Sequence, residues 1–103
     1  MVVLKRFGEE TGIISFPKPG YTLAMDIPVS GRKLFSSLKK LDRCVLNNGG
    51  RVYLGKDACL SAESFRKMYP RYGEWLDLKQ KFDPQNIFSS NLSRRLKISG
   101  VQK

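Results

Sequence analysis

Residues 21–28 read YTLAMDIP, and this stretch decides the fold class because its side chains alternate in character. One set of alternate positions carries large apolar side chains: Tyr21, Leu23, Met25 and Ile27. A period of two is typical of a β-strand, and the proline at the end of the stretch terminates it. The other face carries small side chains, Thr22 and Ala24, which either pack under a covering helix or leave room for a ligand.

A second strand and a first helix flank this stretch in the sequence. The run VVLKRFG at residues 2–8 is β-branched at its start and ends in glycine, which predicts a strand that pairs antiparallel with the first. Ser30 is the expected N-cap of a helix, and NNGG at 47–50 is a strong stop signal. Between them, apolar residues recur at helical spacing: Leu34, Leu38, Leu41 and Val45.

Beyond the stop signal, the sequence predicts another short strand and two more helices. The strand is RVYL at residues 51–54, a run of β-forming residues. Ser61 is the expected cap of a helix that ends near Tyr69. A further helix is expected to begin at Pro70 and to end at Asp83, which is followed by proline.

The C-terminal end of the chain is expected to add little further structure. Residues 85–98 predict a turn and a last short helix, and the tail at 99–103 is expected to be frayed. The main elements follow the order β-β-α-β-α-α. We therefore predict an α+β fold, in which an antiparallel strand pair accompanies packed helices.

Composition limits the chain of 103 residues to one small domain with a single modest core. It has no apolar run of about 18 residues and no signal-peptide pattern, so we expect a cytoplasmic protein, with peripheral membrane contact left open. Histidine is absent, and Cys44 and Cys59 form no recognisable metal or redox set, so no metal site is predicted. The abrupt start in a strand suggests a piece of a longer chain.

The net charge of +10 raises the hypothesis that the protein binds a polyanion. The basic residues are dispersed, however, and a solvated basic surface explains them equally well. Four aromatic residues interleave with basic ones, as in proteins that stack single-stranded nucleic acid: Phe65, Tyr69, Tyr72 and Trp75. Their helical spacing favours a helix pair that buries them. A free-standing basic module that binds nucleic acid or another polyanion is therefore the alternative function.

Residues 50–57 read GRVYLGKD, which resembles a phosphate-binding loop but lacks its essential features. Asp57 stands where such a loop needs a serine or threonine for Mg²⁺, and the β-forming residues 51–54 cannot curl around a phosphate. Lys56 has two interpretations. In the first, the Asp57 carboxylate holds the Lys56 ammonium and directs it into a cleft. In the second, Lys56 and Asp57 form a surface ion pair that contributes little to stability.

Several blocks of the sequence together resemble the C-terminal end of FAD-linked oxidases of the vanillyl-alcohol-oxidase superfamily. These blocks are VVLKRFG at 2–8, SFPKPG at 15–20, GGRVYLGKD at 49–57, FRKMYPR at 65–71 and FDPQNIF at 82–88. The last is a general terminator of the superfamily, whereas the others are more specific. They are similar to the decaprenylphosphoryl-β-D-ribose 2′-oxidase group, which is related to the sugar-lactone oxidases.

The resemblance implies roles for six residues in hydride transfer from a sugar carbinol to flavin. Lys56 matches a lysine that points into the active site beside flavin and substrate, and Tyr53 matches a tyrosine close to the flavin. Substrate-side positions are matched by Lys5, Phe7, Thr22 and Ala24. At the last two, the mycobacterial enzymes have Asn and Cys. This departure affects the identity of the sugar, which in that group is a polyprenyl-phosphate-linked pentose.

The resemblance also implies how the chain is divided. Residues 1–49 would end the cap, or substrate-binding, domain, and residues 50–103 would complete the FAD-binding domain. The N-terminal segment that binds the FAD diphosphate has no counterpart here, so we expect the parent protein to be the enzyme and this chain alone to bind FAD weakly and be inactive. Its partners would be a sugar or sugar-phosphate-lipid substrate and the rest of the flavoprotein. Uncovered apolar surface would favour self-association.

Overall fold

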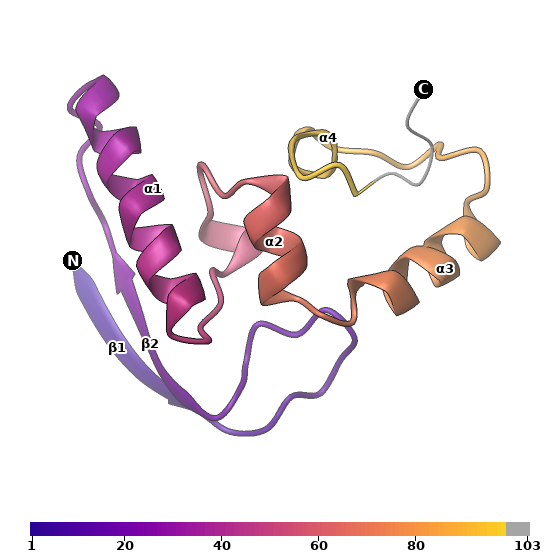
Figure 1. Ribbon diagram of the computed structural model, residues 1–103, viewed down its shortest axis with the longest axis horizontal. Coiled ribbons are helices and arrows are strands. Elements are labelled where there is room, and N and C mark those ends of the chain that lie inside the picture. The colour runs from indigo at the N-terminus through magenta and orange to yellow at the C-terminus, as the bar shows by residue number, and fades with distance from the viewer. Residues whose placement is uncertain (99–103) are drawn as a thin grey trace.

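The computed structural model describes residues 1–98 and contains two strands, four α-helices and a 3-10 turn (Figure 1). In chain order the elements are β1 (Val2–Phe7), β2 (Gly20–Met25), α1 (Arg32–Asn47), the 3-10 turn (Leu54–Lys56), α2 (Ala62–Met68), α3 (Tyr72–Phe82) and α4 (Asn91–Arg95). The predicted α+β class and antiparallel strand pair are confirmed. The tail at 99–103, which we expected to be frayed, lies outside the described residues. Within the described chain, none of the helices combines the length and apolar character needed to cross a membrane.

The two strands form an isolated antiparallel hairpin whose faces differ sharply in exposure. The register pairs Val2 with Met25 at one end and Phe7 with Gly20 at the other. Because directly paired residues share a face, the inner face carries the partly buried side chains of Val3, Phe7, Thr22 and Ala24, together with the exposed Lys5. The outer face carries exposed residues, most of them large and apolar: Val2, Leu4, Arg6, Tyr21, Leu23 and Met25.

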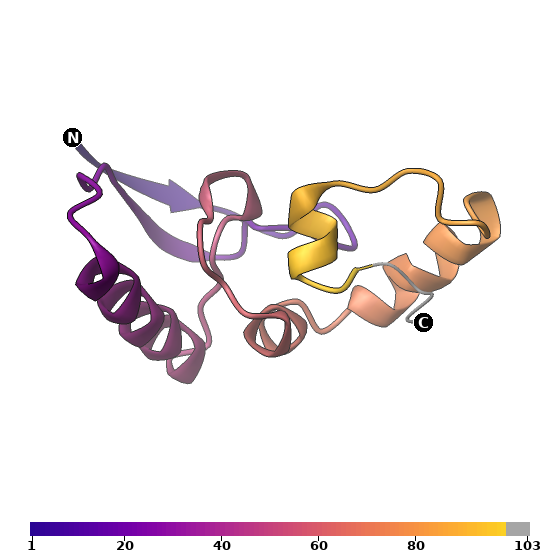
Figure 2. The same cartoon turned by 90° about the horizontal axis from the view of Figure 1, so that it is seen from above.

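The long helix α1 accompanies the hairpin at one end of the molecule, whereas α3 and α4 lie toward the other end (Figures 1 and 2). The predicted cap at Ser30 is wrong. Gly31 is the N-cap, and its φ of 106° is one that glycine adopts without strain. The predicted stop is confirmed, since α1 ends at Asn47. Beyond it, Gly49 has a φ of 72° and donates its N–H to the Leu46 carbonyl at 3.1 Å.

The short strand predicted at 51–54 is not formed. Tyr53 does have extended backbone angles, φ −73° and ψ 116°, but no strand lies beside it among the described residues. The chain instead turns, with the Lys56 N–H donating to the Tyr53 carbonyl at 3.1 Å to close the 3-10 turn. Local β-propensity cannot make a strand without a partner for its hydrogen bonds.

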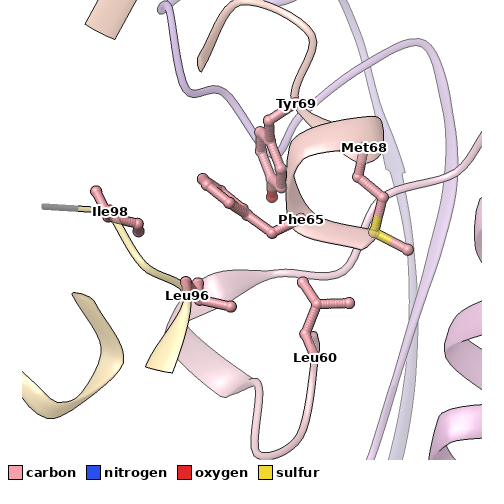
Figure 3. Close-up of a cluster of buried hydrophobic side chains, with 6 residues drawn as sticks. All are labelled: Leu60, Phe65, Met68, Tyr69, Leu96 and Ile98. Atoms are coloured by element: carbon pink, nitrogen blue, oxygen red, sulfur yellow. The ribbon is translucent and has the colours of Figure 1, made fainter. Parts of the chain in front are cut away.

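The core lies where α2 meets the segment before it and the end of α4 (Figure 3). It consists of Leu60, Phe65, Met68, Tyr69, Leu96 and Ile98. Ser61 is the N-cap of α2, as predicted, and accepts the Ser64 N–H, and the predicted stop at Asp83 is the C-cap of α3. The predicted start of α3 at Pro70 is wrong: a turn, in which the Tyr72 N–H donates to the Tyr69 carbonyl at 3.0 Å, precedes the helix, which begins at Tyr72. Phe65 lies 5.3 Å from both Tyr69 and Tyr72, ring centre to ring centre, which confirms the interpretation of the aromatic residues as a buried cluster.

The chain as a whole is more open than its size requires. Its accessible surface is 7832 Å², against about 5,900 Å² for a compact monomer of this mass. The radius of gyration is 14.8 Å, where about 13 Å is typical. The outer face of the hairpin is an exposed apolar surface that no other part of the described chain covers. Such a surface is one that a further layer of protein would bury.

Candidate functional site

Four of the six predicted site residues lie on the inner face of the hairpin. Lys5 pairs directly with Thr22, and Phe7 and Ala24 follow on the same face at two-residue spacing. Thr22 and Ala24 are half-buried, as is Phe7, whereas Lys5 is exposed. One cationic side chain therefore stands among small and aromatic ones on this face.

An aromatic chain connects the hairpin to the segment at 51–57. The ring of Phe7 meets the ring of Phe16 edge-on, with centres 5.7 Å apart. Phe16 in turn lies 5.1 Å from the ring of Tyr53. The structure thus links two predicted site residues, Phe7 and Tyr53, through a third residue that the sequence analysis had not assigned to the site. Its signal was available, since Phe16 belongs to the SFPKPG block.

Two of these aromatic residues, Phe16 and Tyr53, line an open pocket of about 330 Å³. Its wall comes from the loop between β1 and β2, from the start of the 3-10 turn and from α2: Thr11, Gly12, Ile14, Ser15, Phe16, Pro17, Tyr53, Leu54 and Tyr69. Tyr53 is 48% exposed, so a flat ligand can reach its ring. A planar aromatic group fits such a wall by stacking.

Lys56 ends the 3-10 turn and is exposed. Its expected pairing with Asp57 is not formed, because the Asp57 carboxylate is 2% exposed and makes an ion pair with Arg95 of α4 instead. Within residues 1–98, the Lys56 ammonium has no hydrogen-bond or ion-pair partner, so it can meet a ligand. Asp57 accepts two further hydrogen bonds, from the backbone N–H groups of Cys59 at 3.0 Å and Leu60 at 2.9 Å.

The ring of Tyr53 folds back over Gly55. A Cβ atom added to Gly55 would stand 2.7 Å from Cζ and 2.8 Å from the hydroxyl oxygen of Tyr53, well inside van der Waals contact. Glycine at this position therefore allows the phenol to lie next to the residue that precedes Lys56. The turn brings the two predicted flavin-side residues, Tyr53 and Lys56, onto one short loop.

Arg51 anchors the opposite end of this loop. Its side chain is 8% exposed and makes an ion pair with Glu10 at 2.9 Å. It also donates to the carbonyl oxygens of Ser15 and Met68, each at 2.7 Å. The guanidinium carbon lies 5.3 Å from the centre of the Tyr69 ring. Arg51 therefore joins the loop between the strands to the core.

Within the described residues, Cys44 and Cys59 are free thiols. The Cys59 thiol lies 3.7 Å from Oδ2 of Asp42, a residue of α1. Burial, together with the negative charges of Asp42 and Asp57, raises the pKa of this thiol. Burial and the charge of Asp57 likewise raise the pKa of the Asp42 carboxyl. A thiol held in its protonated form is a poor nucleophile, so Cys59 is a packing residue here.

Comparison with known proteins matches most of this chain. A family model described as D-arabinono-1,4-lactone oxidase matches residues 24–96. Decaprenylphosphoryl-beta-D-ribose oxidase of Mycolicibacterium smegmatis is 40% identical over 97 residues, which are 93% of this chain and 21% of that protein. A Streptomyces coelicolor protein named "Uncharacterized protein in mprA 5'region" is 38% identical over 95 residues, 91% of this chain and 26% of that protein. The chain thus spans about a fifth to a quarter of the length of these curated relatives.

Proposed function

The chain belongs to the D-arabinono-1,4-lactone oxidase family, and on that premise we propose that it is the C-terminal part of an FAD-dependent oxidoreductase. In the intact enzyme a sugar hydroxyl would be oxidised to a ketone, as the carbinol carbon loses a hydride to the flavin and the hydroxyl oxygen loses its proton to water. The observation that carries the proposal is the aromatic contact from Phe7 through Phe16 to Tyr53. It joins the substrate-side face of the hairpin to the flavin-side loop.

The residues present suit one edge of a flavin ring. Tyr53 and Phe16 offer a tilted aromatic wall, and Lys56 offers an ammonium that is free to meet a ligand. In the proposed reaction, Lys56 donates a hydrogen bond to the reacting hydroxyl oxygen or stabilises negative charge that develops beside the flavin. Its exposure agrees with either role, because a lysine already paired with Asp57 would have to break that pair first.

The inner face of the hairpin would form the substrate wall. Lys5 supplies positive potential toward a sugar phosphate, and Phe7, Thr22 and Ala24 shape the space around the sugar. The M. smegmatis relative is named for a decaprenylphosphoryl pentose. We therefore propose a polyprenyl-phosphate-linked pentose as the substrate class. Because its lipid tail stays in the bilayer, a cytoplasmic enzyme would work peripherally at the membrane surface.

We propose a boundary between two domains near residue 50. Residues 1–49, with the hairpin and α1, would belong to the cap domain, and residues 50–103 would complete the FAD-binding domain. The concentration of buried apolar residues after this boundary supports the division. The rest of the flavoprotein chain is the expected partner for the exposed outer face of the hairpin.

A chimeric oxidase tests the proposal. The matching segment of the M. smegmatis protein is replaced with this chain, and the purified product is examined for flavin absorbance and for its bleaching by a sugar substrate. We expect flavin to bind and to bleach. Lys56→Ala should lower kcat by about 100-fold or more with flavin retained, whereas Lys40→Ala on the exposed side of α1 should leave it unchanged. A folded chimera that never binds flavin would contradict the proposal.

The structure does not favour the alternative of a nucleic-acid-binding module. Phe65 and Tyr69, which would have to stack with bases, are 0% and 2% exposed. A polyanion could still meet the dispersed basic surface. Oligonucleotide binding that falls steeply as salt rises would support that alternative, and no binding at low salt would remove it.

A further inference from the structure

The loop from Arg51 to Asp57 is held at its two ends by buried charged residues of opposite sign. Between them, Val52 and Leu54 pack against the core, whereas Tyr53, Gly55 and Lys56 are exposed. We propose that Arg51 and Asp57 are positioning residues, which hold Tyr53 and Lys56 at a set place between the hairpin and the core. The effect of these two residues on catalysis depends on the proposed function. The structural part of the inference stands on contacts within this chain alone.

Arg51 connects the start of the loop to both sides of the site. Through Glu10 and the Ser15 carbonyl, at 2.9 and 2.7 Å, it holds the connection between the strands. Through the Met68 carbonyl, at 2.7 Å, it holds the C-terminal end of α2. Phe16 directly follows Ser15, so this bond also sets where the Phe16 ring meets Tyr53. Arginine suits the task because its planar fork donates in several directions at once.

Asp57 fixes the other end of the loop to the core. One carboxylate oxygen accepts the N–H groups of Cys59 and Leu60, and Leu60 is a core residue. The other oxygen pairs with Arg95, the last residue of α4. The carboxylate directly follows Lys56 in the chain, so its three partners define where the lysine backbone stands. No other residue of the described chain joins the loop to α4 by an ion pair.

The two anchors hold different parts of the site, and this predicts different kinetic effects. Loss of the Arg51 contacts would displace Phe16 and the inner face of the hairpin, which should raise the KM for the sugar more than it lowers kcat. Loss of the Asp57 contacts would displace Lys56, which should lower kcat more than it changes KM. A merely structural role would lower the apparent kcat in proportion to the folded fraction and leave KM unchanged, so kcat is expressed per flavin-loaded enzyme.

Amide hydrogen exchange tests the structural part on the 103-residue chain and on the chimera. In Asp57→Ala the amides of Cys59 and Leu60 lose their acceptor, and we expect them to exchange about tenfold faster or more. Asp77→Ala, which removes an exposed carboxylate on α3, is the matched control and should leave both amides unchanged. Unchanged exchange in folded Asp57→Ala would overturn the proposal. If Asp57→Ala does not fold, Arg95→Gln tests the same anchor from its other side and must speed exchange near residue 57.

A double-mutant cycle in the chimera tests the catalytic part. We expect Asp57→Ala to lower kcat by about 10- to 100-fold, the range that a displacement of about 1 Å can produce. If Asp57 acts through Lys56, the same change should have little effect in a Lys56→Ala background. An equal loss in both backgrounds would overturn this role. Arg51→Lys, with Arg43→Lys as control, should raise KM by about tenfold with kcat within about threefold, and parallel losses would overturn the role of Arg51.

These measurements separate the two proposals. If the unmutated chimera binds no flavin, the proposed function fails, and amide exchange alone then decides whether Arg51 and Asp57 anchor the loop. If the chimera is active but the exchange and the kinetic differences do not appear, the positioning role fails and the proposed function remains.

Discussion

The two ends of the described chain differ in how they use their apolar residues. From residue 57 onward, α2, α4 and the segments beside them bury six apolar side chains, four of them at 2% exposure or less. In residues 1–47, no apolar side chain is fully buried. The hairpin nevertheless carries large apolar side chains on its outer face, where they are 45% to 73% exposed. The core region therefore buries apolar side chains against one another, whereas the apolar side chains of the hairpin need a further layer of protein to be buried.

This difference has an energetic basis. A two-stranded hairpin is marginal in water by itself and usually needs a further strand or a packed layer. Here the hairpin is tied to the rest of the described chain mainly through its connecting loop, by Arg51, by the Phe16 ring and by Lys18, whose Nζ donates to the Gly49 carbonyl at 2.7 Å. Its own packing against α1 is slight.

Removing the centre of the core should cause the largest loss. Phe65 is 0% exposed and contacts two aromatic rings, so Phe65→Ala should lower the free energy of unfolding by about 3–5 kcal/mol. Leu4→Ala on the outer face of the hairpin, where the side chain is 67% exposed, should lower it by less than about 0.5 kcal/mol. Urea unfolding followed by Trp75 fluorescence measures both. Similar losses would contradict the contrast between the two regions.

Removing the contacts of Arg51, which join the hairpin loop to the core, should cause the next largest loss of stability. Arg51→Met keeps the apolar stem but removes the ion pair with Glu10 and two hydrogen bonds to carbonyl groups. We expect a loss of about 2–3 kcal/mol. Amide exchange should rise in β1 and β2 before it rises in α2. Arg71→Met, at an exposed pair with Glu74, is the control, and an equal effect there would refute the role of Arg51.

Alkaline pH should destabilise the core region through one phenol. Burial raises the pKa of Tyr69 from 10.0 to about 12, so between these values the unfolded chain releases a proton that the folded chain keeps. The free energy of unfolding should therefore fall as pH rises from about 10 to about 12, by on the order of 1–2 kcal/mol. Tyr69→Phe lacks this titration, so the difference between the two unfolding curves isolates it. The variant also loses the hydrogen bond to the Val52 carbonyl, at 2.8 Å, at every pH below that range.

A charge on the outer face of the hairpin should change association with almost no change in stability. Leu23 is 53% exposed and lies among other apolar residues, so Leu23→Lys should shift the stability by less than about 0.5 kcal/mol. Self-association of the chain, measured by sedimentation, should weaken. Ser36→Lys adds the same charge on the exposed side of α1 and should leave association unchanged. If both variants associate as the unmutated chain does, the outer face of the hairpin is not the surface through which the chain associates.

Local signals in the sequence predicted most of the helices and strands, but not the contacts that these elements make with distant parts of the chain. Helix ends at Asn47, Ser61 and Asp83 follow from capping and stop residues whose bonds are made within a few residues of the chain. The strand expected at 51–54 failed because it needs a partner that the local sequence cannot provide. The six predicted site residues came from a resemblance, and the sequence had not assigned Phe16, Arg51 or Asp57 to the site.

Local sequence is enough to predict that side chains alternate between two faces in the strands, that apolar and basic residues occupy different sides of the first helix, and where the first three helices stop. These depend on interactions between near neighbours. Only the tertiary structure decided which partner each buried charge takes: Asp57 pairs with Arg95 across 38 positions of sequence and leaves its neighbour Lys56 free. A buried carboxylate needs several donors at once. The backbone amides of Cys59 and Leu60 come from the next three residues, whereas only folding supplies the distant Arg95.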